Sequence, residues 1–316
     1  MNFPRAARYK ILVLAIVSAL VFFILFKTSV HGPTFLGVLR TIDLRFFWLA
    51  FALVPLLFLC NGVRWYFVLR AAGFFVPLFQ VIKVVLGSTS FSVIPGRIGD
   101  FARSYPLRRY IPVPEAIGTI ILEKIMDVFV LLGYAAVGFF TLGYVRVALL
   151  IFCFFVAVPV LLTLVATFQK QTISSHKLVQ KIYDALGILK RVQSHKLFLL
   201  LALLSSVFNW SLAILQFYWL MTAVHAATPF IAAMAFVPLS IFVGLIPITL
   251  AGAGTRDAAF VFFLQRYASS GQSLSASVLY GLQGYWIPAL VCLPLLYFFF
   301  KRPKEENGET LPGQTT

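Results

Sequence analysis

The chain has 316 residues, of which 61% are hydrophobic and 11% are charged, and its mean hydropathy is +0.95. A soluble domain carries about 25% charged residues, so this composition excludes an ordinary soluble protein. The net charge of +16 would suggest nucleic acid for a soluble protein. In a membrane protein basic cytoplasmic loops and anionic headgroups explain it, and we expect no nucleic-acid partner.

Apolar runs of about 18 residues or more predict membrane-spanning helices, and the alternating pattern of a β-barrel is not seen. In the first half we predict spans at about 9–26 and 46–69 with a polar loop between them, a short apolar helix at 81–94, and spans at 115–140 and 147–168. In the second half we predict a span at 197–224, an apolar segment at 229–250 that Pro238 and Pro247 interrupt, a short piece at 252–267 and a last span at 276–300.

We treat the chain as one integral membrane domain. It divides into a first half at 1–168, an amphipathic cytoplasmic linker at 169–196, a second half at 197–300 and a disordered tail at 301–316. The basic N-terminus before the first span, with no clear cleavage site after it, is typical of an uncleaved anchor. Because the linker and the tail are rich in Lys and Arg, we expect both termini in the cytoplasm. As a separate expectation, the membrane is the cytoplasmic membrane of a bacterial or archaeal cell.

Two polar breaks interrupt the apolar runs. The first, at 94–105, combines helix breakers with charges: Pro95, Gly96, Arg97, Gly99, Asp100 and Arg103. The second, at 246–257, contains Pro247, Gly252, Gly254, Arg256 and Asp257. Irregular backbone at membrane depth is tolerated only where protein or a water-filled cavity satisfies its polar groups. We therefore interpret the two breaks as walls of a positively charged polar cavity.

The breaks lead to an all-α polytopic architecture of six full spans plus two broken or re-entrant hairpins, or eight spans if the hairpins cross. At an offset of 152 residues, Ile94-Pro95 matches Ile246-Pro247, and five further inserted residues bring Asp100 onto Asp257. The hairpins would then open to opposite sides of the membrane. This makes an inverted repeat, a common transporter architecture, a further possibility.

The charges of the first break suit an anionic headgroup. Asp100 and Arg103 are three residues apart and would pair on a helix, and a guanidinium such as that of Arg97 binds phosphate bidentately. The alternative is a cytoplasmic loop whose arginines only satisfy the positive-inside rule. For the second break, Arg256 and Asp257 with Gly252 and Gly254 form either an outer counterpart of this site or a solvated loop pair.

Glu123 and Asp127 are four residues apart, so they lie on one face of a predicted span, with Lys124 pointing elsewhere. Acids at membrane depth need a partner or a proton. We weigh a structural ion pair, with Arg64 or Arg97 as partner, against a proton relay. Arg64 and its neighbours Asn61 and Trp65 also suit interfacial anchoring near the end of a span.

The chain resembles the lysylphosphatidylglycerol synthase transmembrane region, a flippase-like family. The resemblance rests on Asn61, Arg64 and Trp65, on Pro95-Gly96-Arg97-x-Gly99-Asp100, on Glu123 and Asp127 of the span at 115–140, and on Gly252-x-Gly254-x-Arg256-Asp257. The similarity extends over about residues 10–300. Glu is frequent in the family where Asp100 and Asp257 stand. The resemblance implies lipid translocation, and it implies no synthase activity here, because the aminoacyl transfer of such proteins belongs to a separate soluble domain.

We therefore expect a lipid flippase that moves an anionic or lipid-linked headgroup across the cytoplasmic membrane. The substrate-binding residues would be Arg97, Gly99, Asp100, Arg103, Gly252, Gly254, Arg256 and Asp257, and the gating or coupling residues would be Arg64, Glu123 and Asp127. The expected partners are membrane lipids, either anionic phospholipid or lipid-linked sugar, and we allow for a homodimer. We expect no metal, cofactor or catalytic residue. The alternatives are a membrane-embedded glycosyl or headgroup transferase and a proton-coupled small-molecule transporter.

Overall fold

The computed structural model describes Ile16, Leu20 and a few neighbouring positions of the first predicted span, and then residues 32–91, 98–168, 195–246, 249 and 252–295. Most of the first span, nearly all of the segment 169–196 and the tail at 301–316 lie outside this part. So do Pro95, Gly96, Arg97 and Pro247 from the two breaks. Within it, every regular element is a helix, as predicted.

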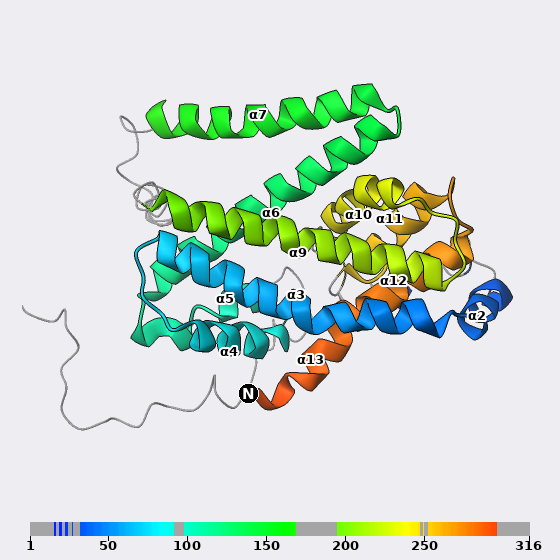
Figure 1. The fold of residues 1–316 in the computed structure, drawn as a ribbon, viewed down its shortest axis with the longest axis horizontal. Helices are drawn as coiled ribbons and strands as arrows, with labels where there is room; N and C mark the ends of the chain where they lie inside the picture. Colours follow the sequence, from blue (N-terminus) through cyan, green and yellow to red (C-terminus); the bar gives the residue numbers. More distant parts are fainter. Residues whose placement is uncertain are drawn as a thin grey trace, which may run out of the picture.

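Two long antiparallel helices lie side by side along the length of the molecule (Figure 1). They are α3 (Leu44–Ala71) and α9 (Lys196–Ala223), and both are long and apolar enough to cross a membrane. The amide of Asp43, before α3, donates to the carbonyl of Ala223 at 2.8 Å. At the opposite end, the guanidinium of Arg70 lies 5.3 Å from the ring of Phe198. The start of each helix therefore lies beside the end of the other.

The first half continues with α4 (Leu78–Thr89), the short α5 (Ile98–Ala102), a 3₁₀ turn (Pro106–Arg109), α6 (Val113–Thr141) and α7 (Val145–Phe168). Gly143 has φ +83° and makes the tight turn between α6 and α7. Before α3, the predicted polar loop is wrong in part, because Gly32–Arg40 forms α2. Its basic Arg40 lies in the last turn, where the helix dipole favours positive charge.

The second half contains α10 (Phe230–Gly244), α11 (Thr255–Leu264), α12 (Ser270–Gly281), a π-helical turn η5 (Leu282–Trp286), α13 (Ile287–Val291) and a final 3₁₀ turn (Leu293–Leu295). The predicted interruption at Pro238 is wrong, because α10 is continuous through it. The last helical run begins earlier than predicted, since Ser269 and Gln272 form a capping box that starts α12.

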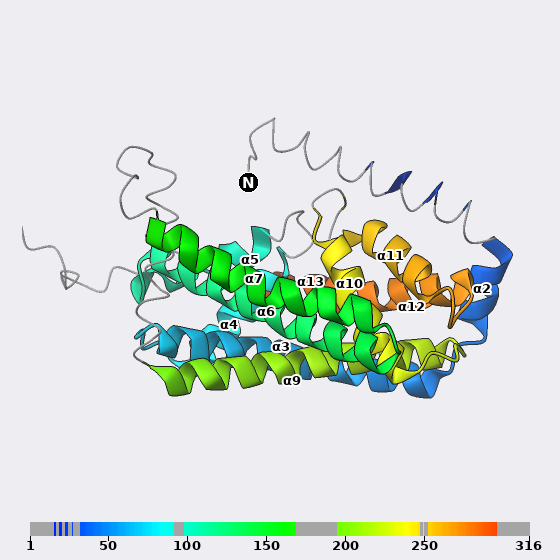
Figure 2. The same ribbon diagram turned by 90° about the horizontal axis from the view of Figure 1, so that it is seen from above.

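The two halves repeat in inverted orientation. Leu44 and Lys196 begin α3 and α9 while Ala71 and Ala223 end them, so both bounds differ by 152 positions. The helices that follow, α4 and α10, each start after a proline, Pro77 and Pro229, at the same offset. We call the helices from α3 to α7 the first unit and those from α9 to α13 the second unit. Because α3 and α9 are antiparallel, the two units run in opposite directions across the bundle. Figure 2 shows α10, α11 and α12 toward the opposite end of the pair from α4 and α5.

Candidate functional site

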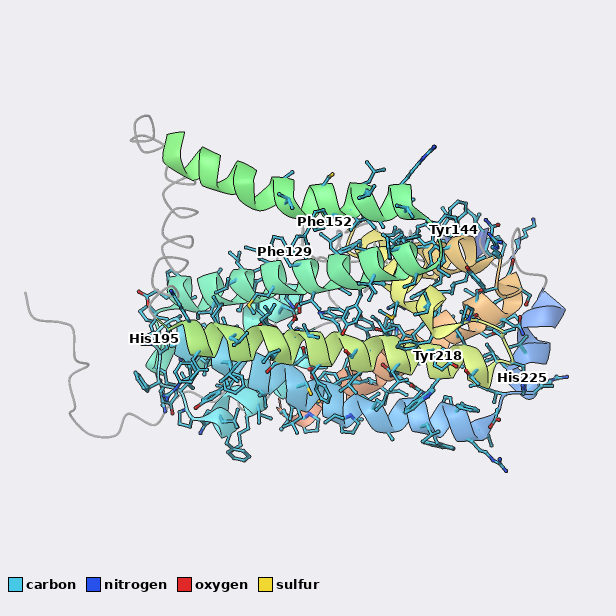
Figure 3. The ribbon with its side chains drawn as sticks, turned by 45° about the horizontal axis from the view of Figure 1, so that its top comes forward. Phe129, Tyr144, Phe152, His195, Tyr218 and His225 are labelled. Atoms are coloured by element: carbon cyan, nitrogen blue, oxygen red, sulfur yellow. The ribbon has the colours of Figure 1, made fainter. Side chains whose placement is uncertain are left out.

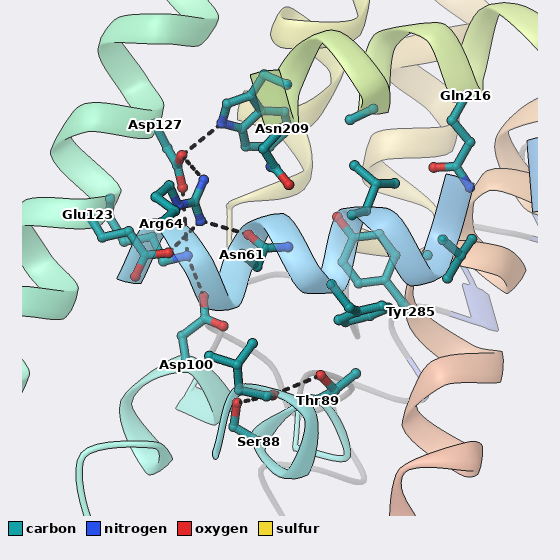
Figure 4. Close-up of a pocket in the computed structure, with 18 of the residues that line it drawn as sticks. Asn61, Arg64, Ser88, Thr89, Asp100, Glu123, Asp127, Asn209, Gln216 and Tyr285 are labelled. Carbon is teal, nitrogen blue, oxygen red and sulfur yellow. Dashed lines mark hydrogen bonds and ion pairs between the residues drawn. The ribbon is translucent and has the colours of Figure 1, made fainter. Parts of the chain in front are cut away.

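A polar cavity of about 170 Å³ lies between the two units. Its lining comes from α3, α4, α5, α6 and α9 and from the helices after α11 (Figure 4). The polar lining residues are Asn61, Arg64, Ser88, Thr89, Asp100, Arg103, Glu123, Lys124, Asp127, Asn209, Trp210, Gln216, Tyr280 and Tyr285. The cavity thus brings together residues separated by more than 200 positions in the sequence.

Arg64 is the centre of the charged part of the cavity. Its guanidinium donates to Asp127 and Glu123 on α6 and, at 2.8 Å, to Oδ1 of Asn61 one turn away. Oδ1 of Asp127 also accepts hydrogen bonds from α9, from Ser206 at 2.9 Å and from Nε1 of Trp210 at 2.8 Å. This cluster joins α3, α6 and α9, and of the alternatives left open by the sequence it matches the ion pair with Arg64.

Arg103 completes the cluster from the first break. It pairs with the second oxygen of Glu123, and its guanidinium lies 4.4 Å from the ring of Trp65. Trp65 is fully buried, and its Nε1 donates to Oγ1 of Thr119 at 3.1 Å. The prediction that Arg64 and Trp65 anchor the protein at the membrane interface is therefore wrong. Arg64 and Glu123 are only 2% and 0% exposed, and charges buried to this degree need such partners.

Lys124 also belongs to the cavity, which corrects the prediction that it points elsewhere. Its Nζ lies 2.9 Å from Oδ2 of Asp100 and 3.9 Å from Oδ2 of Asp127, three residues further along the same helix. Residues three apart are neighbours on a helix surface. Asp100 and Arg103, which the sequence predicts as a pair, thus each have an ion-pair partner on α6.

The α9 side of the cavity is absent from the predicted site residues, although the sequence contains a signal for it. Ser206, Asn209, Ala213 and Gln216 recur at helical spacing along an otherwise strongly apolar span. Asn209 is 5% exposed, and among the described residues its Oδ1 has no hydrogen-bond partner. Nε2 of Gln216 donates to Oε1 of Gln283 at 3.1 Å. A buried acceptor without a partner carries a free-energy cost that a ligand donor would remove.

The second break is a buried helix start, so its interpretation as a solvated loop is wrong. Arg256 and Asp257 are 4% and 2% exposed. Asp257 caps α11 by accepting from the amide of Gly254 at 2.9 Å, and it also accepts from Arg256 at 3.1 Å and from Ser277. Gly252 and Gly254 have φ values of +75° and +100°, which only glycine adopts readily.

Arg256 adjoins the cavity through two tyrosines. Its guanidinium lies 5.7 Å from the ring of Tyr280 and 5.2 Å from that of Tyr285, and both rings line the cavity. Gly281 leaves room for the guanidinium, because a Cβ there would lie 2.6 Å from it. The residues of the second break therefore contact the wall of the cavity without belonging to its lining. Arg97 lies outside the described residues, and Gly99 lies within α5.

The charges that line the cavity balance among the residues that the structure describes. Arg64, Arg103 and Lys124 face three carboxylates, which belong to Asp100, Glu123 and Asp127. The expectation of a positively charged cavity is therefore not met in this part of the chain. The cavity has a charged end around Arg64 and a neutral end, with amides and tyrosines, formed by α9 and the last helices.

Two comparisons with known proteins bear on this arrangement. A family model described as the lysylphosphatidylglycerol synthase TM region matches residues 10–292, which is most of the chain. A comparison with curated proteins gave no match.

Proposed function

The chain belongs to the lysylphosphatidylglycerol synthase TM region family, and on that premise we propose that it is a lipid translocase. Membership of this family makes it a multi-pass membrane protein with a role connected to membrane lipids. The substrate would be a lipid with an anionic or lipid-linked headgroup. The membrane would be the cytoplasmic membrane of a bacterium or archaeon, with both termini in the cytoplasm.

The observation that carries this proposal is the polar cavity between two inverted helical units. A polar headgroup in the hydrocarbon core of a bilayer loses its hydrogen bonds to water, at a cost of several kcal/mol. A cavity with charges at one end and amides at the other replaces those bonds inside the membrane. Inverted units around a central site can open the site to either side in turn. Both features match the needs of a translocase.

We further propose that the protein moves a lipid without chemically modifying it. A hydrolytic or transferase site needs an acid or base that is free to exchange a proton. In the described cavity, Glu123 is held by two arginines, and Asp127 by Arg64, Ser206 and Trp210. This fixed pairing supports the structural interpretation of the two acids over a proton relay or a catalytic role.

The test is translocation of fluorescent phosphatidylglycerol in proteoliposomes, followed by the fraction that an external reductant can quench. Asn209→Leu keeps the size of the side chain and removes its free acceptor, so a headgroup hydrogen bond of about 1–1.5 kcal/mol is lost. We expect the translocation rate to fall about tenfold.

The matched control is Phe208→Leu, because Phe208 is 52% exposed on the same helix. This variant should translocate at the rate of the parent protein. Both variants should give the same thermal unfolding temperature as the parent. A parent protein without translocation activity above empty liposomes, with phospholipid or with lipid-linked sugar, would refute the proposal.

A further inference from the structure

Lys124 lines a second hollow as well as the polar cavity. This hollow, of about 270 Å³, lies between α6 and α7, and Phe101 of α5 also lines it. Apart from Lys124, its lining is apolar and consists of α6 residues between Ile121 and Leu132 and of Phe154 on α7. We call it the α6–α7 groove. Figure 3 shows the side chain of Phe129, one of its lining residues, in the space between these two helices.

The Lys124–Asp100 ion pair separates the groove from the cavity. Asp100 lines the cavity and the next residue, Phe101, lines the groove, so α5 also contributes to both. Among the residues that the structure describes, Lys124 is the one side chain that borders both hollows. The polar cavity and the apolar groove therefore adjoin each other at this ion pair.

This pair is the exchangeable one among the ion pairs of the cavity. The side chains of Lys124 and Asp100 are 30% and 29% exposed, whereas those of Arg64, Arg103 and Glu123 are at most 4% exposed. A partly exposed pair contributes little to stability and is easily replaced by another partner. Breaking the buried pairs would leave uncompensated charges in the interior. An incoming anion would therefore displace Asp100 from Lys124 before it disturbed the rest of the cluster.

We propose that the Lys124–Asp100 pair is a lateral entrance for an anionic phospholipid. The phosphate takes the place of Asp100 at Lys124, the headgroup occupies the polar cavity, and one acyl chain lies along the α6–α7 groove. The two ends of such a lipid match the two hollows in polarity, and its phosphate matches the charge of the residue between them. The proposal rests on the proposed function and names the substrate class and its route into the cavity.

The first experiment maps the chain site by photo-cross-linking. The full-length protein in nanodiscs is labelled with phosphatidylglycerol that carries a diazirine in one acyl chain, and the cross-linked peptides are identified by mass spectrometry. We expect labelling concentrated on α6 near Val128 and on α7 near Phe154, and displaced by excess unlabelled phosphatidylglycerol. Labelling spread evenly over lipid-facing helices, or displaced only by a polyprenyl phosphate, would overturn the proposal.

Two variants on α6 separate the groove from the general lipid surface. Val128→Trp fills the groove and should lower groove labelling by about tenfold, equivalent to one decade in affinity. Val137→Trp is the matched control, because Val137 is 52% exposed on the same helix outside the groove. Equal labelling in the two variants would contradict a specific chain site.

Three charge variants test whether Lys124 binds the phosphate. Lys124→Arg keeps the positive charge and should retain groove labelling. The exchange Lys124→Asp with Asp100→Lys inverts the ion pair and brings an acid toward Asp127. We expect it to lose labelling while its thermal unfolding temperature shows that it is still folded. Lys124→Met with Asp100→Leu removes the pair without leaving either charge unpaired and should lose labelling too. Wild-type labelling in the exchanged protein would show that the pair is only structural and would overturn the proposal.

Cross-linking and translocation report different failures. Specific groove labelling in a protein that does not translocate would refute the proposed function and leave the lipid site intact. Translocation without specific groove labelling would refute the lateral entrance alone.

Discussion

At the scale of single residues, the protein depends on a few buried charges with fixed partners. Arg64 reaches two carboxylates and an amide, and Glu123 reaches two arginines. The favourable hydrogen bonds of such a cluster offset the desolvation of its charges only while every partner is present. The cluster therefore holds α3, α6 and the first break in one arrangement around the cavity.

Removing one charge from the cluster should destabilise the protein strongly. Glu123→Gln leaves Arg64 and Arg103 without their shared carboxylate, and loss of a buried partner costs about 3–5 kcal/mol. We expect a clearly lower unfolding temperature in detergent supplemented with lipid. Asp100→Asn is the comparison, because that carboxylate is 29% exposed and its pair with Lys124 is worth at most about 1 kcal/mol. Equal loss of stability in the two variants would contradict this account.

At the scale of helices, close approach depends on glycines at crossing points. A Cβ added at Gly138 on α6 would lie 2.5 Å from the backbone nitrogen of Ala235 on α10. At Gly133, five residues earlier on α6, an added Cβ would meet nothing within 4 Å. Because α6 carries the acids of the cavity and α10 belongs to the other unit, this contact fixes how the two units meet.

The two glycines give a matched pair of variants. Gly138→Ala should force α6 and α10 apart and destabilise the protein by about 1–3 kcal/mol, the usual cost of overpacking. Gly133→Ala should leave stability unchanged or raise it by up to about 1 kcal/mol, because alanine favours the helix. Thermal unfolding of both variants checks this. A Gly138→Ala protein as stable as the parent would show that the contact is looser than the structure indicates.

At the scale of the whole molecule, the antiparallel pair of α3 and α9 determines which segments face which side of the membrane. Thr41, before α3, lies beside His225, after α9, with 2.7 Å between the Thr41 carbonyl and Nε2 of His225. Phe75, just after α3, lies at the other end and is 77% exposed. If the termini are cytoplasmic, Thr41 faces the outside and Phe75 faces the cytoplasm.

This topology can be tested with single cysteines in a background that lacks Cys60, Cys153 and Cys292. A maleimide that does not cross membranes should label Thr41→Cys in intact cells and should label Phe75→Cys only after the membrane is opened. Labelling of both positions from outside would contradict the antiparallel crossing. Labelling of Phe75→Cys alone would keep the crossing and reverse the proposed orientation.

Hydropathy alone is enough to predict the all-α membrane class, the positions of α3, α6, α7 and α9, and the two polar breaks. These properties are local, because a span is recognised by its own length and composition. The sequence also predicts that Glu123 and Asp127, one turn apart inside a span, need a partner or a proton, but it leaves open whether that partner is Arg64. The sequence also predicts that Arg256 lies at a break between helices. It does not predict that this side chain contacts Tyr280 and Tyr285 in the cavity wall.

Only the tertiary structure determined which partners the charges take and which helices enclose the cavity. Asp127 accepts from Arg64, 63 positions away, and from Trp210, 83 positions away. Lys124 pairs with Asp100 because α5 folds against α6, and Asn209 reaches the cavity because α9 lies antiparallel to α3. Hydrophobic periodicity shows that a face is buried but not what it packs against. Such contacts depend on helix packing across the whole chain, which no short stretch of sequence specifies.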